Sequence, residues 1–143
     1  MTTAITRRED STFDCAGAQV RAQSRHLATV VTIRGEIDVI NVDMVRAYLR
    51  RFLLGTEPVV LDLSDMTAFA PVGVGFLCRF DDDCRSAGLE WRLVTSPAVV
   101  ELLGEHAGAM FPVTRSVHEA LRNLADAIAS RRQVMLSLIR KSA

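Results

Sequence analysis

Five stretches of the chain have the apolar patterns of β-strands. Residues 18–23 and 27–37 are rich in Val, Ile and Thr and predict a hairpin. Residues 58–63 form a short continuous apolar run, which is typical of a central strand covered on at least one face. Residues 89–94 alternate between apolar and polar positions. Residues 110–114 predict a short edge strand, because their proline has no N–H group to donate.

Helical spacing of apolar residues predicts two long helices in the first two thirds of the chain. The first spans about residues 42–54, and Asn41 before it offers an N-cap. The second begins near residue 73 and ends at Gly88, with a charged face opposite its apolar one. Its apolar stripe consists of Gly73, Phe76, Leu77, Phe80, Cys84 and Ala87.

Two further helices are predicted in the last third. A short one begins at Pro97. The last begins at residues 116–119, whose Ser and Glu form a capping box, and runs to about residue 139. Its final part, residues 131–143, is amphipathic with a basic rim. This extension either packs on the protein's own sheet or docks on a partner, a second copy or a membrane surface.

The order of the elements predicts a single α/β domain, because two strands are followed by alternating helices and strands. We expect a small mixed sheet of about five strands, with about four helices packed mainly on one side. Residues 1–12 are polar and predict a flexible N-terminus. The domain is expected to span residues 13–130, and residues 131–143 to form a C-terminal helical extension.

Composition and charge narrow the class of protein. The chain has 143 residues, of which 49% are hydrophobic, so it can bury a core without disulfides or metals. Its 17 acidic residues balance 17 basic ones, which leaves no net field to attract nucleic acid or an anionic membrane. The three cysteines form no CxxC pair and are expected as reduced thiols. Without a signal peptide or an apolar segment of bilayer length, we expect a cytoplasmic protein.

Three motifs follow one another at characteristic spacings: GEID at 35–38, DLS at 62–64 and GVG at 73–75. From about residue 18 to about residue 130, the chain resembles the STAS domain, a family that includes bacterial anti-sigma factor antagonists. The family fold agrees with the predicted elements. The resemblance implies a non-enzymatic module for partner switching in transcription regulation, which binds an anti-sigma factor and so releases a sigma factor. In such systems the anti-sigma factor is often a serine kinase, and phosphorylation breaks the complex.

The start of the second helix departs from the family pattern. The family motif D-S-S-G aligns with Ala70, Pro71, Val72 and Gly73, so three polar side chains are replaced. Val72 occupies the position of the serine that is phosphorylated in the family, and it has no hydroxyl. The phosphorylation site is therefore degenerate, and the loop resembles the dephosphorylated, binding-competent state. Phe69 is expected in the core. Residues 70–72 are expected on a partner-facing surface, with inward packing as the alternative.

Three other polar residues near this loop allow two interpretations each. By family analogy Asp38 belongs to the partner surface, whereas by local chemistry it caps the first helix. Ser64 and Thr67 are alternative phosphate acceptors, although short hydroxyl side chains in turns more often bond to the backbone. The predicted partner-binding residues are Asp38, Ala70, Pro71, Val72 and Gly73.

The remaining patterns predict no catalytic residue, metal or cofactor. Residues 81–83 are consecutive aspartates on a helix, and they fan around its axis instead of converging on one ion. Besides the antagonist, we consider a STAS scaffold subunit of a membrane lipid ABC transport complex, and an enzyme, which the apolar loop disfavours. We expect no direct nucleic-acid contact and no membrane insertion, and the sequence allows a homodimer.

Overall fold

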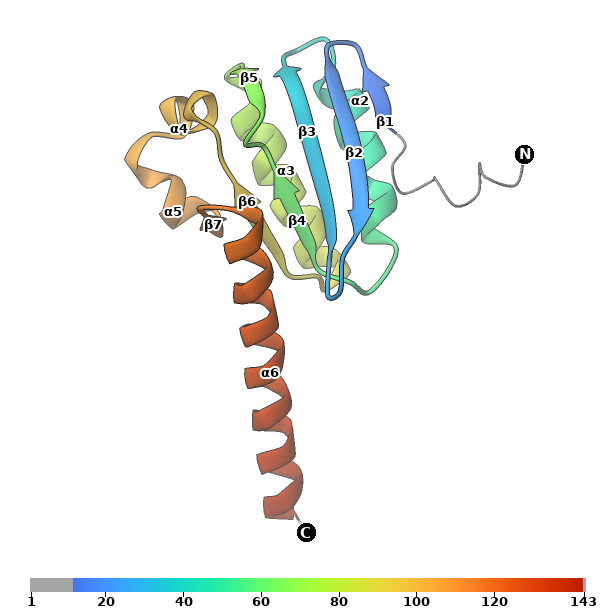
Figure 1. The fold of residues 1–143 in the computed structure, drawn as a ribbon, viewed down its shortest axis with the longest axis vertical. Helices are drawn as coiled ribbons and strands as arrows, with labels where there is room; N and C mark the ends of the chain where they lie inside the picture. The colour runs from blue at the N-terminus through green and yellow to red at the C-terminus, as the bar shows by residue number, and fades with distance from the viewer. Residues whose placement is uncertain (1–11, 143) are drawn as a thin grey trace, which may run out of the picture.

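A computed structural model describes residues 12–142, and it contains one mixed sheet with the strand order β1-β2-β3-β4-β6-β7, in which β5 also pairs with β3 (Figure 1). The N-terminus that we predict to be flexible lies, apart from Thr12, outside the described residues. The strands are β1 (Thr12–Cys15), β2 (Ala18–Ser24), β3 (Thr29–Ile37), β4 (Val59–Asp62), β5 (Met66–Phe69), β6 (Trp91–Val94) and β7 (Val113–Thr114).

All four predicted helices form, together with short helical turns. The helical segments are α2 (Val42–Leu49), η2 (Arg50–Leu53), α3 (Val72–Ala87), α4 (Pro97–Leu103), η3 (Gly104–His106), α5 (Ala107–Met110) and α6 (Val117–Ser142). At the start of α6 the predicted capping box is present, since the N–H of Glu119 donates to Ser116 Oγ at 3.0 Å. None of the helices within the described range combines the length and apolarity that crossing a bilayer requires.

The α/β fold class is confirmed, but the sheet has seven strands where about five were predicted. β1 escaped prediction because three of its four residues are exposed, so it has no apolar alternation. No strand is predicted at residues 66–69, which form β5. It exists because β4 pairs with the first half of β3, at Thr29–Thr32, and leaves the second half open. β5 then occupies that open half, from Gly35 to Ile37.

Alternate residues of the central strands face two separate cores. Val31, Leu61 and Leu93 point into the larger core, which α2 and α3 cover. These two helices lie behind the sheet in Figure 1. The smaller core is on the other face and is covered by α6 alone; its buried members are Ala28, Val30, Val60, Val94, Ala120 and Leu124. β4 is therefore buried on both faces, whereas its continuous apolar run predicts cover on at least one face.

The last helix leaves the sheet halfway along its length. Its first turns cover the smaller core, whereas every residue from 129 to 141 is exposed. In Figure 1 the second half projects well beyond the sheet. The expected boundary between residues 130 and 131 thus falls inside one continuous helix, close to where it leaves the sheet.

Candidate functional site

The predicted partner-binding residues come together at the carboxyl ends of two neighbouring strands. β3 ends at Ile37, just before Asp38, and β5 ends at Phe69, just before Ala70. Ile37 and Phe69 are partners in the parallel ladder. One more bond, from the N–H of Ala70 to the carbonyl of Ile37 at 2.9 Å, joins the two turns. Two turns more than 30 residues apart in sequence therefore lie side by side at the carboxyl ends of their strands.

Asp38 organises the turn between β3 and α2. Its Oδ1 accepts hydrogen bonds from the N–H groups of Ile40 at 2.9 Å and Asn41 at 3.1 Å. Its carbonyl accepts the N–H of Val42 at 3.0 Å. The carboxylate thus holds the turn that leads into α2, and its bonds go to N–H groups that precede the first residue of the helix. A contact between Asp38 and a partner stays a prediction.

Asn41 does not act as the cap that the sequence predicts. It occupies the N-cap position of α2 but makes no side-chain cap bond. The residue is fully buried, and its amide donates to the carbonyls of Glu36 at 2.8 Å and Ala16 at 3.2 Å. Its Oδ1 accepts the N–H of Asp38 at 3.0 Å. A buried amide needs such partners, so Asn41 ties this turn to the β1–β2 turn.

The two glycines of the GVG motif have different surroundings. A Cβ atom on Gly73 would overlap the ring of Phe69, which is 8% exposed and belongs to the larger core, as predicted. A Cβ atom on Gly75 would meet nothing within 4 Å. Close packing between helix and sheet therefore explains Gly73, whereas Gly75 leaves an open stretch of backbone on the surface of α3.

The loop that replaces the family motif is partly inside and partly outside. Ala70 and Val72 are half-buried, and Val72 packs against the larger core. Pro71 is exposed and immediately precedes the first residue of α3. Both interpretations of the sequence thus describe part of this loop: Val72 leans inward, while Pro71 presents an apolar ring to solvent.

Sequence reasoning missed an exposed apolar pair beside this loop. Val39 and Ile40 are 74% and 76% exposed, and Met44 on α2 is 45% exposed. The signal was present in GEIDVIN, because two β-branched residues stand in a turn where polar residues are the rule. We call the apolar patch formed by Val39, Ile40, Met44, Pro71 and Val72 the carboxyl-end surface.

A shallow groove between α2 and α3 borders the carboxyl-end surface. Its volume is about 300 Å³. Arg46 on α2 and Asp83 on α3 form an ion pair at 3.2 Å, which bridges the two helices. The groove is lined by Val42, Asp43, Arg46, Pro71, Val72, Gly75, Phe76 and Arg79. The open backbone at Gly75 therefore lies inside the groove, where another chain can approach closely.

The polar residues around the loop have structural partners. The Thr67 hydroxyl donates to the carbonyl of Gly35 at 3.1 Å, and the Ser64 hydroxyl donates to Asp62 Oδ1 at 2.6 Å. Asp81 accepts the indole N–H of Trp91 at 2.8 Å. Across the described residues, no group of His, Cys, Asp or Glu side chains is arranged to hold a metal ion.

The three cysteines are free thiols in different environments. Cys78 is exposed, whereas Cys15 and Cys84 are buried. The pKa of Cys84 is raised to about 12, mainly by burial and to a smaller extent by the negative charges of Asp81 and Asp83. Burial, followed by the charge of Asp14, raises the pKa of Cys15 as well. Neither buried thiol is therefore ionised enough at neutral pH to act as a nucleophile.

Comparisons with known proteins give one matching family and one similar relative. The profile of the STAS domain matches residues 18–120. Osmosensory protein A from Mycobacterium tuberculosis (strain ATCC 25618 / H37Rv) is 56% identical over 144 residues, which cover 96% of this chain and 90% of the relative.

Two solved structures share the fold at low sequence identity. An anti-sigma factor antagonist from Mycobacterium paratuberculosis superposes with a TM-score of 0.62 at 21% identity, covering 74% of this chain and 92% of the other. The unphosphorylated form of the anti-sigma factor antagonist SpoIIAA superposes with a TM-score of 0.61 at 14% identity, covering 75% and 96%.

Proposed function

The chain belongs to the STAS domain family, and from this premise we propose that it is a non-enzymatic binding module of the anti-sigma factor antagonist type. The carboxyl-end surface carries the proposal. Val39 and Ile40 expose about three quarters of their side chains in a turn that is rigidly hydrogen-bonded, and such apolar exposure is typical of a protein interface. The two structural neighbours, both named as anti-sigma factor antagonists, support the choice of partner.

The proposed surface is uncharged at the position where the family is switched off. A phosphate adds nearly two negative charges and breaks an apolar contact through its desolvation cost. Val72 accepts no phosphate, so the surface stays competent to bind unless another residue takes over. Ser64 and Thr67 are the nearest hydroxyls, and both already donate hydrogen bonds within the protein.

The name of the 56% identical relative suggests when the protein acts. We propose that partner binding takes place in the cytoplasm as part of a response to osmotic stress. The main alternative is a STAS scaffold in a membrane lipid ABC transport complex, which would use the same surface on a different partner.

Affinity capture with the full chain, followed by mass spectrometry, tests the proposal. We expect an anti-sigma factor among the captured proteins. Its dissociation constant for Ile40→Asp should be about tenfold or more above that for wild type. Ile40 is 76% exposed, so this variant folds normally. Val72→Asp should act in the same direction, but Val72 also touches the core. Val134→Asp on the projecting helix is the matched control and should bind like wild type.

Three results would contradict the proposal or parts of it. Undiminished binding by both Ile40→Asp and Val72→Asp would place the interface elsewhere. Capture of a permease or an ATPase in place of an anti-sigma factor would favour the transport scaffold. Phosphate mapped to residues 64–67 after incubation with a cognate kinase would show that the switch had moved.

A further inference from the structure

The apolar stripe of α6 continues after the sheet beneath it has ended. Val117, Leu121 and Leu124 cover the smaller core, and the same heptad spacing leads on to Ile128, Met135 and Leu138. Five large apolar side chains of the projecting half are each 54–62% exposed: Val134, Met135, Leu136, Leu138 and Ile139. Of these, Met135 and Leu138 lie on the face that buries the sheet in the first half of the helix, so that face is exposed in the second half.

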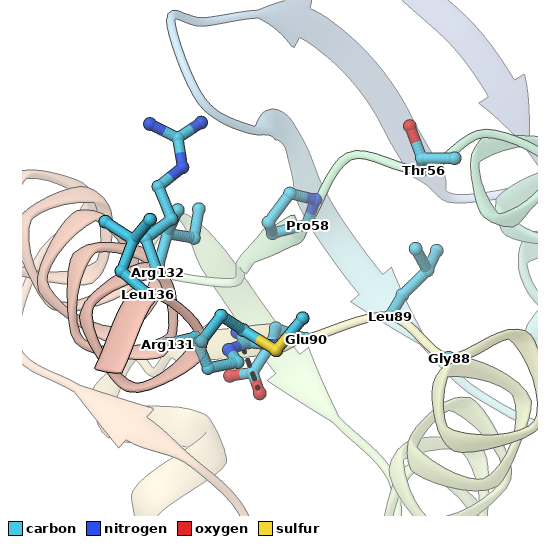
Figure 2. Close-up of a pocket in the computed structure, with 10 residues that line it drawn as sticks. Thr56, Pro58, Gly88, Leu89, Glu90, Arg131, Arg132 and Leu136 are labelled. Atoms are coloured by element: carbon cyan, nitrogen blue, oxygen red, sulfur yellow. Dashed lines mark ion pairs between the residues drawn. The ribbon is translucent and has the colours of Figure 1, made fainter. Parts of the chain in front are cut away.

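A cavity of about 560 Å³ lies beside this part of α6, and its wall on α6 is formed by Ile128, Arg131, Arg132, Met135 and Leu136. In Figure 2, Leu136 on α6 lies on one side of this cavity, and Pro58 and Leu89, which precede β4 and β6, lie on the other. The apolar walls consist of Pro58, Leu89, Ile128, Met135 and Leu136, and we call this cavity the amino-end wedge. It lies at the opposite end of the strands from the carboxyl-end surface.

Two arginines, Arg131 and Arg132, line the wedge, and they belong to a positively charged half of α6. Arg131, Arg132, Arg140 and Lys141 lie on the projecting half, and residues 127–143 contain no acidic residue. Because the whole chain is formally neutral, these four charges leave −4 on the remainder. Glu90 is the acidic residue lining the wedge, and it is already bonded by Arg92 at 3.1 Å and Arg131 at 3.5 Å (Figure 2). Whole-chain neutrality therefore hides a cationic projecting half of α6.

We propose that the amino-end wedge binds an acidic amphipathic helix of a partner protein. The apolar walls fit the apolar stripe of such a helix, and its acidic face would lie against the arginines of the wedge. Arg132 has no ion-pair partner among the described residues, so its guanidinium is available for a bidentate carboxylate contact. This second surface lies apart from the carboxyl-end surface, so the module can hold two partners at once.

Two other occupants fit the observations less well. A second copy pairing through α6 would bring the basic residues of one helix against those of the other, and like charges repel. A flat lipid surface is kept from the wall formed by Met135 and Leu136, because Pro58 and Leu89 stand opposite it across the wedge. A helix with an apolar stripe and acidic flanks fits both the shape of the wedge and the positive charge of its arginines.

A library of displayed helical peptides, selected on the full chain and counter-selected on Met135→Glu, tests the proposal. The enriched peptides should carry apolar residues at helical spacing and a net negative charge. Their dissociation constants should rise about tenfold or more for Met135→Glu and for Arg132→Glu, and should rise with salt. Both side chains are exposed, so both variants fold. Ile40→Asp is the control and should bind these peptides like wild type, whatever its effect on the anti-sigma factor.

Several outcomes would overturn this proposal without touching the proposed function. Selection of basic or neutral peptides, equal binding to Met135→Glu, or no enrichment would each do so. Sedimentation that shows a dimer lost in Met135→Glu would assign the wedge to a second copy. Binding to vesicles of phosphatidylcholine and phosphatidylserine, lost in the same variant, would assign it to a membrane.

Discussion

Both ends of the sheet expose apolar residues, but a hydrogen-bonded turn carries them at one end and a projecting helix carries them at the other. At the carboxyl end, Val39 and Ile40 stand on a turn that Asp38 and the buried Asn41 hold with five side-chain hydrogen bonds. At the amino end, the apolar residues stand on a helix that has left the sheet. The first surface is preorganised and neutral, and the second is cationic and attached at its base. Shape should dominate binding at the first, and charge should contribute more at the second.

The largest effect should separate the buried half of α6 from its projecting half. Leu124 and Leu138 occupy the same heptad position, but Leu124 is fully buried and Leu138 is 56% exposed. Leu124→Ala should lower the free energy of unfolding by about 2–5 kcal/mol, since it leaves a cavity in the smaller core. Leu138→Ala should change it by less than about 0.5 kcal/mol. Urea denaturation measures both, and similar losses would mean that the projecting half is packed.

The next effect tests the rigidity of the carboxyl end. Gly73→Ala should destabilise the fold by about 1–3 kcal/mol, because the new Cβ meets the ring of Phe69. Gly75→Ala should stabilise it by about 0.5–1 kcal/mol, since the helix gains a better former at an open position. Denaturant melts of the two variants give the comparison. Adding Phe69→Leu to Gly73→Ala should recover part of the loss, and no recovery would locate the strain elsewhere.

A smaller effect concerns the base of the projecting helix. Glu90→Gln removes the charge that pairs with Arg131 and Arg92, and the free energy of unfolding should fall by up to about 1 kcal/mol. The loss should shrink at high salt, because these groups are partly exposed. Glu105→Gln, at an exposed residue of η3, is the control and should leave stability unchanged. Equal behaviour of the two variants would show that the ion pairs add nothing.

The last effect appears only at alkaline pH and concerns α3, the helix that links the two ends. Its Cys84 keeps its proton in the folded state up to a pKa of about 12, whereas an unfolded thiol ionises near pH 9. The unfolded state therefore loses protons first, and stability that is fully present below pH 9 declines as pH rises toward 12. Urea melts at pH 8 and pH 10 should show a steeper decline for wild type than for Cys84→Ala. Parallel declines would exclude this thiol as a cause.

Most of the fold follows from local patterns in the sequence. The apolar spacings of α2, α3 and α6 predict their positions, and the continuous run at β4 predicts a central strand covered on at least one face. The motifs at 35–38, 62–64 and 73–75 point to the family and to the loop at residues 70–73. These features are readable because each one is encoded within a few consecutive turns or strand residues.

The structure decided what depends on distant neighbours. Residues 66–69 form β5 because β4 leaves half of β3 unpaired. Asn41 links two turns from a buried position because a turn 25 residues earlier offers the carbonyl of Ala16 as an acceptor. The apolar stripe of α6 continues past Arg131 to Leu138, yet the end of the sheet determines where the stripe is covered. The sequence alone therefore determines which faces are apolar. Tertiary packing determines which of them stay exposed, because burial depends on what the rest of the chain can reach.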